Sequence, residues 1–175
     1  MLHLGKTETM RFLAASVLAF SIISASAQQV KLSTDEVDDF TGEVTRVTEY
    51  MMLGDNGEKG YAKYSLKMAA IKVGDVEALW LLPTTDLGCC GASGNYAMFK
   101  FSDGEVLKLE DIAKIDCGDF TSSTILIDDE LKARIDANDA PTMIRLKQSE
   151  FYGDFKTIDA EMWKAVVAAI NPVEE

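Results

Sequence analysis

The feature that most constrains the fold is a series of short strand-like runs, which turn signals separate. Residues 61–73 alternate apolar and polar side chains, as a half-buried strand does, and residues 76–82 are almost entirely apolar, as in a strand covered on both faces. Two short apolar runs flank the Asp103-Gly104 turn within residues 96–109, which predicts a hairpin. Short strands joined by tight turns predict an antiparallel sheet.

Five further runs are rich in β-branched or aromatic residues or alternate in polarity, and each of them predicts a strand. These runs are residues 40–53, 112–117, 121–127, 142–147 and 151–155. Residues 28–37 are polar and predict a loose lead-in. Tight turns are expected at 54–57 and at 74–75, where glycine stands beside aspartate or asparagine.

Two helices are predicted in the C-terminal half. Asp128 is a suitable N-cap for a helix that begins at Asp129, and Thr157 or Asp159 is a suitable N-cap for the last helix. The last helix carries an apolar stripe at helical spacing, formed by Met162, Trp163, Val166, Val167 and Ile170. The sequence therefore predicts an α+β fold, mainly antiparallel β-sheet, with the two C-terminal-half helices packed on one face.

Residues 1–27 have the three parts of a cleavable secretory signal. Arg11 follows Met10 and supplies a positive charge, residues 12–23 form an apolar run of signal length, and Ala25-Ser26-Ala27 offers small residues for cleavage. Met10 is therefore interpreted as the true start. The expectation is a single exported domain over residues 28–175, periplasmic or secreted, with an uncleaved membrane anchor as the alternative.

The charge of the chain excludes several classes of function. The chain carries 17 Lys+Arg and 29 Asp+Glu, a net charge of −12. Because the predicted signal contains Lys6, Arg11 and Glu8, its removal would change the net charge to −13, and it would also remove His3, the only histidine. We therefore expect no nucleic-acid partner, no membrane partner after cleavage, no histidine-based catalytic triad and no histidine-ligated zinc.

Three cysteines predict one disulfide in an oxidising compartment. The candidates are Cys89, Cys90 and Cys117, and the vicinal pairing of Cys89 with Cys90 would gain almost no loop entropy. A bridge from Cys117 to one member of the pair would close a loop of 27 or 28 residues and would stabilise the fold by roughly 3–4 kcal/mol on the loop-entropy model. Which of Cys89 and Cys90 forms it stays open, and the spare thiol leaves a thiol-exchange role as an alternative.

The glycine-rich segment around the cysteine pair predicts a binding loop. It does not predict a phosphate-binding loop, because no Lys-Ser/Thr follows it and no helix begins there. The candidate binding residues are Gly88, Gly91, Ser93, Gly94 and Tyr96. No catalytic residue, metal ligand or cofactor is predicted.

Acidic clusters and aromatic residues receive structural interpretations. The clusters at residues 35–39, 55–58 and 128–130 are interpreted as solvated turns; residues 55–58 lack calcium-loop spacing, and residues 128–130 fit a helix N-terminus. Trp80 and Trp163 are predicted to pack in the core, whereas Tyr61, Tyr64 and Tyr96 are candidates to line a groove.

The function that the sequence favours is a non-catalytic exported binding or accessory domain for an unknown protein, peptide or small-molecule ligand. One version is an inhibitor of a cationic exported enzyme, since a net charge of −13 would steer that association. The alternatives are a carboxylate-based hydrolase, a thiol-exchange protein, and a structural or assembly protein.

Overall fold

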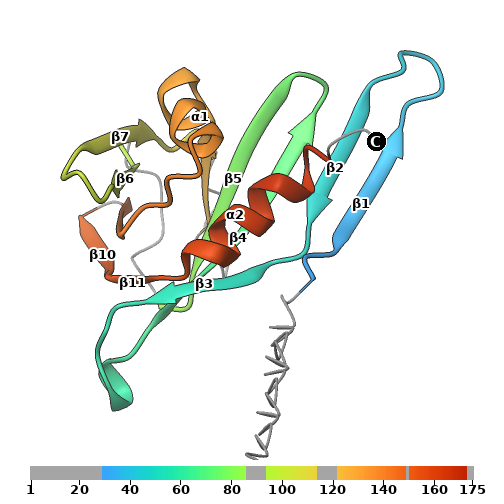
Figure 1. Ribbon diagram of the computed structural model, residues 1–175. Coiled ribbons are helices and arrows are strands. Elements are labelled where there is room, and N and C mark those ends of the chain that lie inside the picture. Colours follow the sequence, from blue (N-terminus) through green and yellow to red (C-terminus); the bar gives the residue numbers. More distant parts are fainter. Residues whose placement is uncertain (1–28, 86–93, 114–121, 149, 173–175) are drawn as a thin grey trace, which may run out of the picture.

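We describe the protein from a computed structural model, in which residues 29–85, 94–113, 122–148 and 150–172 are described (Figure 1). The predicted signal segment, the three cysteines, and Gly88, Gly91 and Ser93 lie outside these residues. Cleavage, the disulfide and most of the binding loop therefore stay predictions. Within the described ranges, no helix has both the length and the apolar character needed to cross a bilayer.

Seven strands form the larger sheet, and their pairings are antiparallel. β4 pairs on one side with β2 and then with β3, and on its other side with β5. β1 lies beyond β2, β11 beyond β3, and β8 beyond β5. The strands are β1 (Leu32–Val37), β2 (Val44–Thr48), β3 (Met51–Asp55), β4 (Ser65–Val73), β5 (Val76–Pro83), β8 (Ser123–Leu126) and β11 (Thr157–Ile158).

Four strands form the smaller sheet, in the order β10-β9-β6-β7. β6 (Tyr96–Lys100) and β7 (Val106–Glu110) form the hairpin that the sequence predicts, and Gly104 takes the positive φ of +91° that its turn requires. β9 (Met143–Gln148) and β10 (Phe151–Phe155) form a second hairpin. The pairing of β6 with β9 joins the two hairpins, so residues 143–147 lie directly beside residues 96–100.

The two sheets meet at both of their sides. At one side, Asp111 follows β7 and forms an isolated bridge with Ile125 of β8. At the other side, the chain leaves β10 and continues directly into β11, which pairs with β3. The inner faces of the sheets are thus held toward each other, and their outer faces point away from the core.

Both predicted helices are present, and both begin where the sequence predicts. Asp128 caps α1 (Asp129–Asp136) by accepting from Leu131 N at 2.9 Å. Asp159 caps α2 (Ala160–Ala169) by accepting from Glu161 N at 3.1 Å and from Met162 N at 3.0 Å. The α+β class with mainly antiparallel sheet is confirmed. The division of the strands between two sheets is an outcome that the sequence pattern did not predict.

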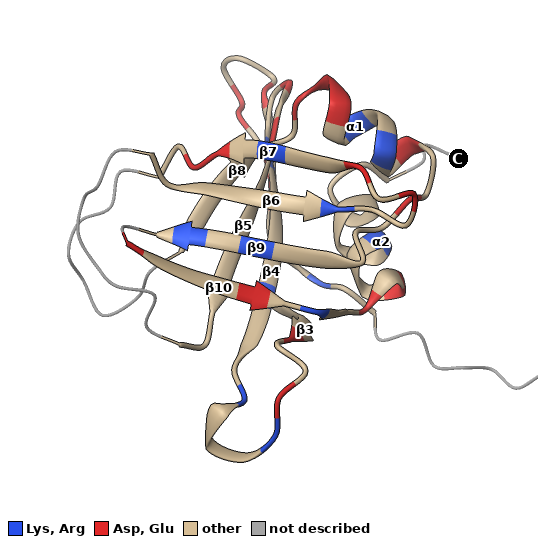
Figure 2. Cartoon of the chain, turned by 90° about the vertical axis from the view of Figure 1, so that its left-hand side faces the viewer, with Lys and Arg blue, Asp and Glu red and all other residues tan. Residues whose placement is uncertain are grey.

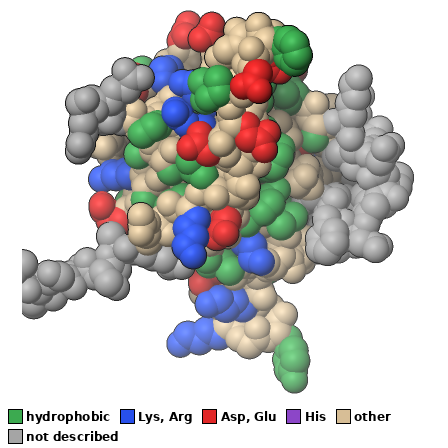
Figure 3. All heavy atoms as spheres, turned by 90° about the vertical axis from the view of Figure 1, so that its right-hand side faces the viewer, with side chains coloured by type: hydrophobic (Ala, Val, Ile, Leu, Met, Phe, Trp, Pro, Cys, Tyr) green, Lys and Arg blue, Asp and Glu red, His purple; other side chains and the backbone are tan. Residues whose placement is uncertain are grey.

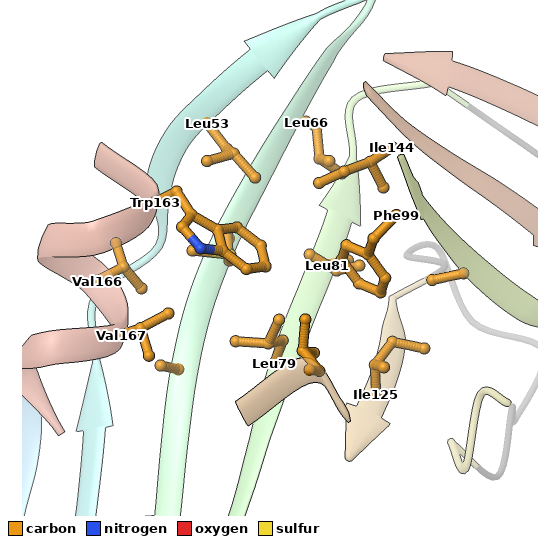
Figure 4. Packing of buried hydrophobic residues seen from close by; sticks show 14 of the residues in the cluster. Leu53, Leu66, Leu79, Leu81, Phe99, Ile125, Ile144, Trp163, Val166 and Val167 are labelled. Carbon is orange, nitrogen blue, oxygen red and sulfur yellow. The ribbon is translucent and has the colours of Figure 1, made fainter. Parts of the chain in front are cut away.

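The core lies between the two sheets and is closed by α2 (Figure 4). Leu53, Leu66, Leu79 and Leu81 point inward from the larger sheet, and Phe99 and Ile144 point toward them from the smaller one. Trp163 of α2 reaches between the sheets and packs on Phe99, with ring centroids 5.8 Å apart. The whole predicted apolar stripe of α2 is buried. Figure 1 shows α2 lying across one face of the larger sheet, which is the inner face.

Two expectations are corrected. Residues 32–37, expected as part of a loose lead-in, form the edge strand β1, because their backbone pairs with β2 despite their polar side chains. Trp80, expected in the core, lies on the outer face of the larger sheet, where it is half-buried and stacks on Tyr50 with centroids 6.4 Å apart. The run 76–82 is apolar on both faces, but only its inner face meets the core.

Glu77 of β5 connects the larger sheet to both helices. Its carboxylate lies 3.3 Å from Lys132 Nζ of α1 and 3.6 Å from Lys72 Nζ of β4, and it accepts from Asn171 Nδ2, beyond α2, at 2.9 Å. Burial raises the pKa of Glu77, but the bond from Asn171 and the charges of Lys132 and Lys72 outweigh burial, so the net pKa lies below its ordinary value of 4.5.

We expect Glu77→Gln to lower the free energy of unfolding by about 1–3 kcal/mol at pH 7, because it removes a charged and largely buried acceptor. A carboxylate whose pKa is lower in the folded state stabilises the fold at pH values above its unfolded-state pKa. That stabilisation is lost as the pH falls through its folded-state pKa. The difference between wild type and variant should therefore shrink below about pH 4.5. Urea unfolding at several pH values measures it. Glu161→Gln is the control, because Glu161 is exposed and pairs only with Lys164 in the described part of the chain.

Candidate binding surface

The outer face of the four-stranded sheet is the candidate functional site. Because side chains alternate along a strand, the positions between the buried residues of each strand point outward. Figure 2 shows this face toward the viewer, with no described element crossing in front of the four strands. We call it the cationic face. It comprises Tyr96, Met98, Lys100, Val106, Lys108, Glu110, Met143, Arg145, Lys147, Tyr152 and Asp154.

The register arranges these side chains in three rows across the sheet. The first row runs Tyr152, Lys147, Tyr96, Glu110; the second runs Asp154, Arg145, Met98, Lys108; the third runs Met143, Lys100, Val106. Neighbours within a row lie on adjacent strands, about 4.5–5.5 Å apart. Each cation therefore has an apolar or aromatic side chain beside it.

Four basic and two acidic side chains lie on the cationic face, in a chain whose net charge is −12. Arg145 is paired with Asp154 through two short contacts, Nε to Oδ1 at 2.5 Å and Nη2 to Oδ2 at 2.7 Å. Among the described residues, Lys100, Lys108 and Lys147 have no ion-pair partner. Three ammonium groups are therefore available to an anionic ligand. By contrast, acidic and basic side chains are interspersed on the side of the molecule in Figure 3.

The ion pair between Arg145 and Asp154 keeps both side chains charged and fixes the position of the guanidinium on the face. The bonds from Arg145 keep the pKa of Asp154 below its ordinary value, and the same bonds raise the pKa of Arg145. Asp154 therefore stays ionised and keeps the guanidinium lying over the sheet. The remaining N–H groups of Arg145 are directed away from this pair, because a guanidinium presents its donors in a planar fork.

Two tyrosine rings lie beneath the cations. Lys108 Nζ is 4.2 Å and Lys147 Nζ is 5.8 Å from the ring centroid of Tyr96, and Arg145 Cζ is 5.7 Å from that of Tyr152. Cation–π contacts of this kind hold long side chains close to the sheet and limit their rotamers. Cations that are already ordered lose less conformational entropy when a ligand binds.

The face contains a shallow hollow of about 200 Å³, lined by Met98, Lys100, Val106, Met143 and Arg145. Met98, Met143 and Val106, on three adjacent strands, contribute apolar surface to it. Lys100 lies between Met143 and Val106 in their row and Arg145 lies beside Met98, so both basic side chains line the hollow as well. The volume is below the range of sites that enclose a small molecule, so the hollow suits one apolar side chain or a similar group.

Two further hollows lie elsewhere on the described surface. A groove of about 290 Å³ between the two helices is lined by Lys132, Lys164, Trp163 and other residues, but Lys132 is already paired with Glu77. A hollow of about 410 Å³ beside β3 and β11 contains the carboxylates Asp55 and Asp159.

The Asp55 and Asp159 pair does not support the hydrolase alternative, because both carboxylates already have structural partners. Asp55 pairs with Lys63 at 2.9 Å and accepts from Gly57 N, and these contacts lower its pKa. Asp159 is the N-cap of α2. A general acid requires a raised pKa. In the described residues, no group of three or more potential metal ligands is present.

The predicted site residues are only partly placed. Of the predicted binding loop, Gly94 and Tyr96 are described; Gly94 has a φ of +95°, and Tyr96 begins β6 and lies in the first row of the cationic face. Tyr64 packs edge-on against Phe155, and Tyr61 is fully exposed on η1 (Gly60–Ala62), so these tyrosines do not share a groove with Tyr96.

The sequence did not identify the basic residues of this face as a site. The alternation of Met143, Arg145 and Lys147 with buried neighbours was visible, and it predicted a strand. What it did not show is that β6 would lie beside β9 and bring Tyr96, Met98 and Lys100 next to them.

No protein-family profile, no curated protein and no solved structure showed a significant match to the chain.

Proposed function

We propose that this chain is an exported, non-catalytic binding domain, and that the cationic face binds an acidic segment of a partner protein. The observation that carries the proposal is the local excess of positive charge. Lys100, Lys108 and Lys147 have no described ion-pair partner, and Lys100 lines the shallow hollow of this face, on a chain whose net charge is −12. Export rests on the signal-like residues 1–27 alone.

An acidic protein segment suits both the charges and the apolar hollow of the cationic face. Unpaired ammonium groups attract carboxylates and speed association, whereas an apolar pocket at the centre of a contact provides most of the lasting affinity. A segment with an apolar side chain flanked by Asp or Glu would place the apolar group in the hollow and its carboxylates near Lys100 and Lys147. This surface favours an anionic partner, in contrast to the cationic enzyme expected from net charge.

Nucleic acid is the competing anionic partner. The negative charge of the rest of the molecule opposes a long phosphate chain, which would extend beyond the four basic side chains of the face. A short acidic segment is confined to the face and avoids most of that repulsion.

The test uses a fluorescein-labelled peptide with one central leucine between pairs of glutamates. We expect binding that weakens as salt rises from about 50 to 300 mM, since ion screening shortens the range of the attraction. We expect Lys100→Glu with Lys147→Glu to weaken binding roughly tenfold or more, which corresponds to about 1.4 kcal/mol. Fluorescence anisotropy measures both effects.

The matched control is Lys31→Glu with Lys59→Glu, which makes the same change in net charge at exposed positions outside the face. This control should change the affinity less than about twofold if the contact is local. Equal weakening by both double variants would show that only net charge matters and would overturn the proposal. Tighter binding of an oligothymidine than of the peptide, or no peptide binding at low salt, would overturn it as well.

A further inference from the structure

The outer face of the larger sheet is strongly apolar, and α2 lies on the opposite face. We call it the apolar face. Its larger apolar side chains are half-buried or exposed. They are Val47, Tyr50, Met52, Ile71, Val73, Val76, Trp80, Leu82 and Leu126.

Strand register places these residues in rows. Val47, Ile71, Ala78 and Leu126 form one row across four strands, and Ala69, Trp80 and Thr124 form the next. Ala69 and Ala78 are buried among larger neighbours, and the Tyr50 ring stacks on Trp80 at an interplanar angle of 25°.

Only two charged residues lie on the described rows of this face. Lys67 pairs with Met52 and Leu82 at one end of β4, and Glu36 of β1 lies opposite Thr45 near the other end. A two-fold axis that lies in the plane of the interface and runs perpendicular to the strands would bring two copies face to face. The Lys67 end of one copy would then lie over the Glu36 end of the other. The charges of the face are therefore self-complementary under that symmetry.

The size of the face matches that of a dimer interface. Five strands about 4.8 Å apart and four rows about 7 Å apart cover roughly 600 Å² in projection. Side-chain relief and the rim raise this value toward the roughly 800 Å² per partner that a stable interface buries. Monomeric proteins rarely expose an apolar patch larger than a few hundred Å².

We propose that the apolar face is the interface of a symmetric dimer of this chain, in which the two larger sheets pack face to face. Sheets that stack in this way lie about 10 Å apart with their side chains interdigitated. The cationic face of each copy stays on the outside, so the dimer would present two such faces. The inference stands on the apolar face and does not depend on the function proposed for the cationic one.

The experiment measures the molecular mass of the purified protein by sedimentation between about 1 and 200 μM, with and without reductant. We expect a dimer that persists in reductant and that does not weaken at higher salt, because apolar burial holds it and salt screens the repulsion between two acidic copies. Binding through the cationic face has the opposite dependence on salt.

The decisive variant is Val76→Lys with Leu126→Lys, two exposed positions on the apolar face. It should raise the dissociation constant of the dimer at least thirtyfold. The control is Phe40→Lys with Tyr61→Lys, which adds the same two charges at fully exposed apolar positions elsewhere and should leave the constant unchanged. Circular dichroism of both variants confirms that each has folded.

Three results would overturn the dimer. One is a wild type that sediments as a monomer at about 200 μM. Another is a dimer that disappears in reductant, which would point to the spare cysteine. The third is an equal effect of the two double variants, which would show that added charge acts without regard to position.

Discussion

Trp163→Ala is expected to lower the free energy of unfolding by about 3–5 kcal/mol, because it truncates a large side chain of the core. Trp163 is 1% exposed and extends from α2 between the two sheets, where its ring packs on Phe99 at 5.8 Å. Alanine would leave a cavity where the helix and both sheets meet. Because domains of this size are stable by about 5–15 kcal/mol in total, a loss this large is a substantial fraction.

The measurement is urea unfolding followed by circular dichroism, with Trp80→Ala as the comparison. Trp80 is the other tryptophan of the chain, and it lies half-buried on the outer face of the larger sheet, so its truncation should cost about 1–2 kcal/mol. Equal losses for the two variants would contradict the assignment of Trp163 to the core and Trp80 to the surface.

Gly54→Ala is expected to lower the free energy of unfolding by about 2–3 kcal/mol, which is the second largest effect. A Cβ atom at Gly54 would lie 2.0 Å from the carbonyl oxygen of Thr157 and 3.1 Å from Cδ1 of Ile158. The nearest atom belongs to backbone, so β11 would have to move away from β3. α2 begins immediately after β11, and the displacement would reach the helix that closes the core.

Gly60→Ala separates this close approach from the ordinary cost of replacing glycine. Gly60 has a φ of +67°, and a Cβ atom there would meet nothing within 4 Å, so its cost should be about 1 kcal/mol from backbone strain alone. Faster hydrogen exchange at the Asp159 amide, which donates to Leu53 O at 2.8 Å, should accompany Gly54→Ala and not Gly60→Ala. Unchanged exchange at Asp159 would contradict the proposed displacement of β11.

Much of the local structure could be predicted because its causes lie close together in the sequence. Asp128 and Asp159 cap the helices through bonds to backbone amides two or three residues away. The Asp103-Gly104 turn brings its own two strands together. Periodicity identified the buried stripe of α2, since helical spacing alone places those side chains on one side.

The candidate site could be predicted only in its parts. Tyr96 was included among the candidate binding residues for its place beside the glycine-rich loop, whereas its neighbours on the cationic face come from the pairing of β6 with β9. The paired residues of these two strands are 43 to 51 positions apart in the chain, and the sequence gave no signal that the strands would be adjacent. Trp80 was misplaced for a related reason, because an apolar strand has two faces and the sequence does not say which of them will be covered.

The sequence by itself determined the α+β class, the two helix starts, the hairpin around Asp103-Gly104 and the acidic balance of the chain. These properties follow from propensity, periodicity and charge, which act over a few residues or over the whole composition. The tertiary structure alone decided that the strands divide into two sheets. It also decided that four cations lie on one outer face, and that Trp80 and its apolar neighbours lie on the other. Strand pairing is set by long-range packing of the inner faces, so what reaches the outer faces depends on contacts that no local pattern encodes.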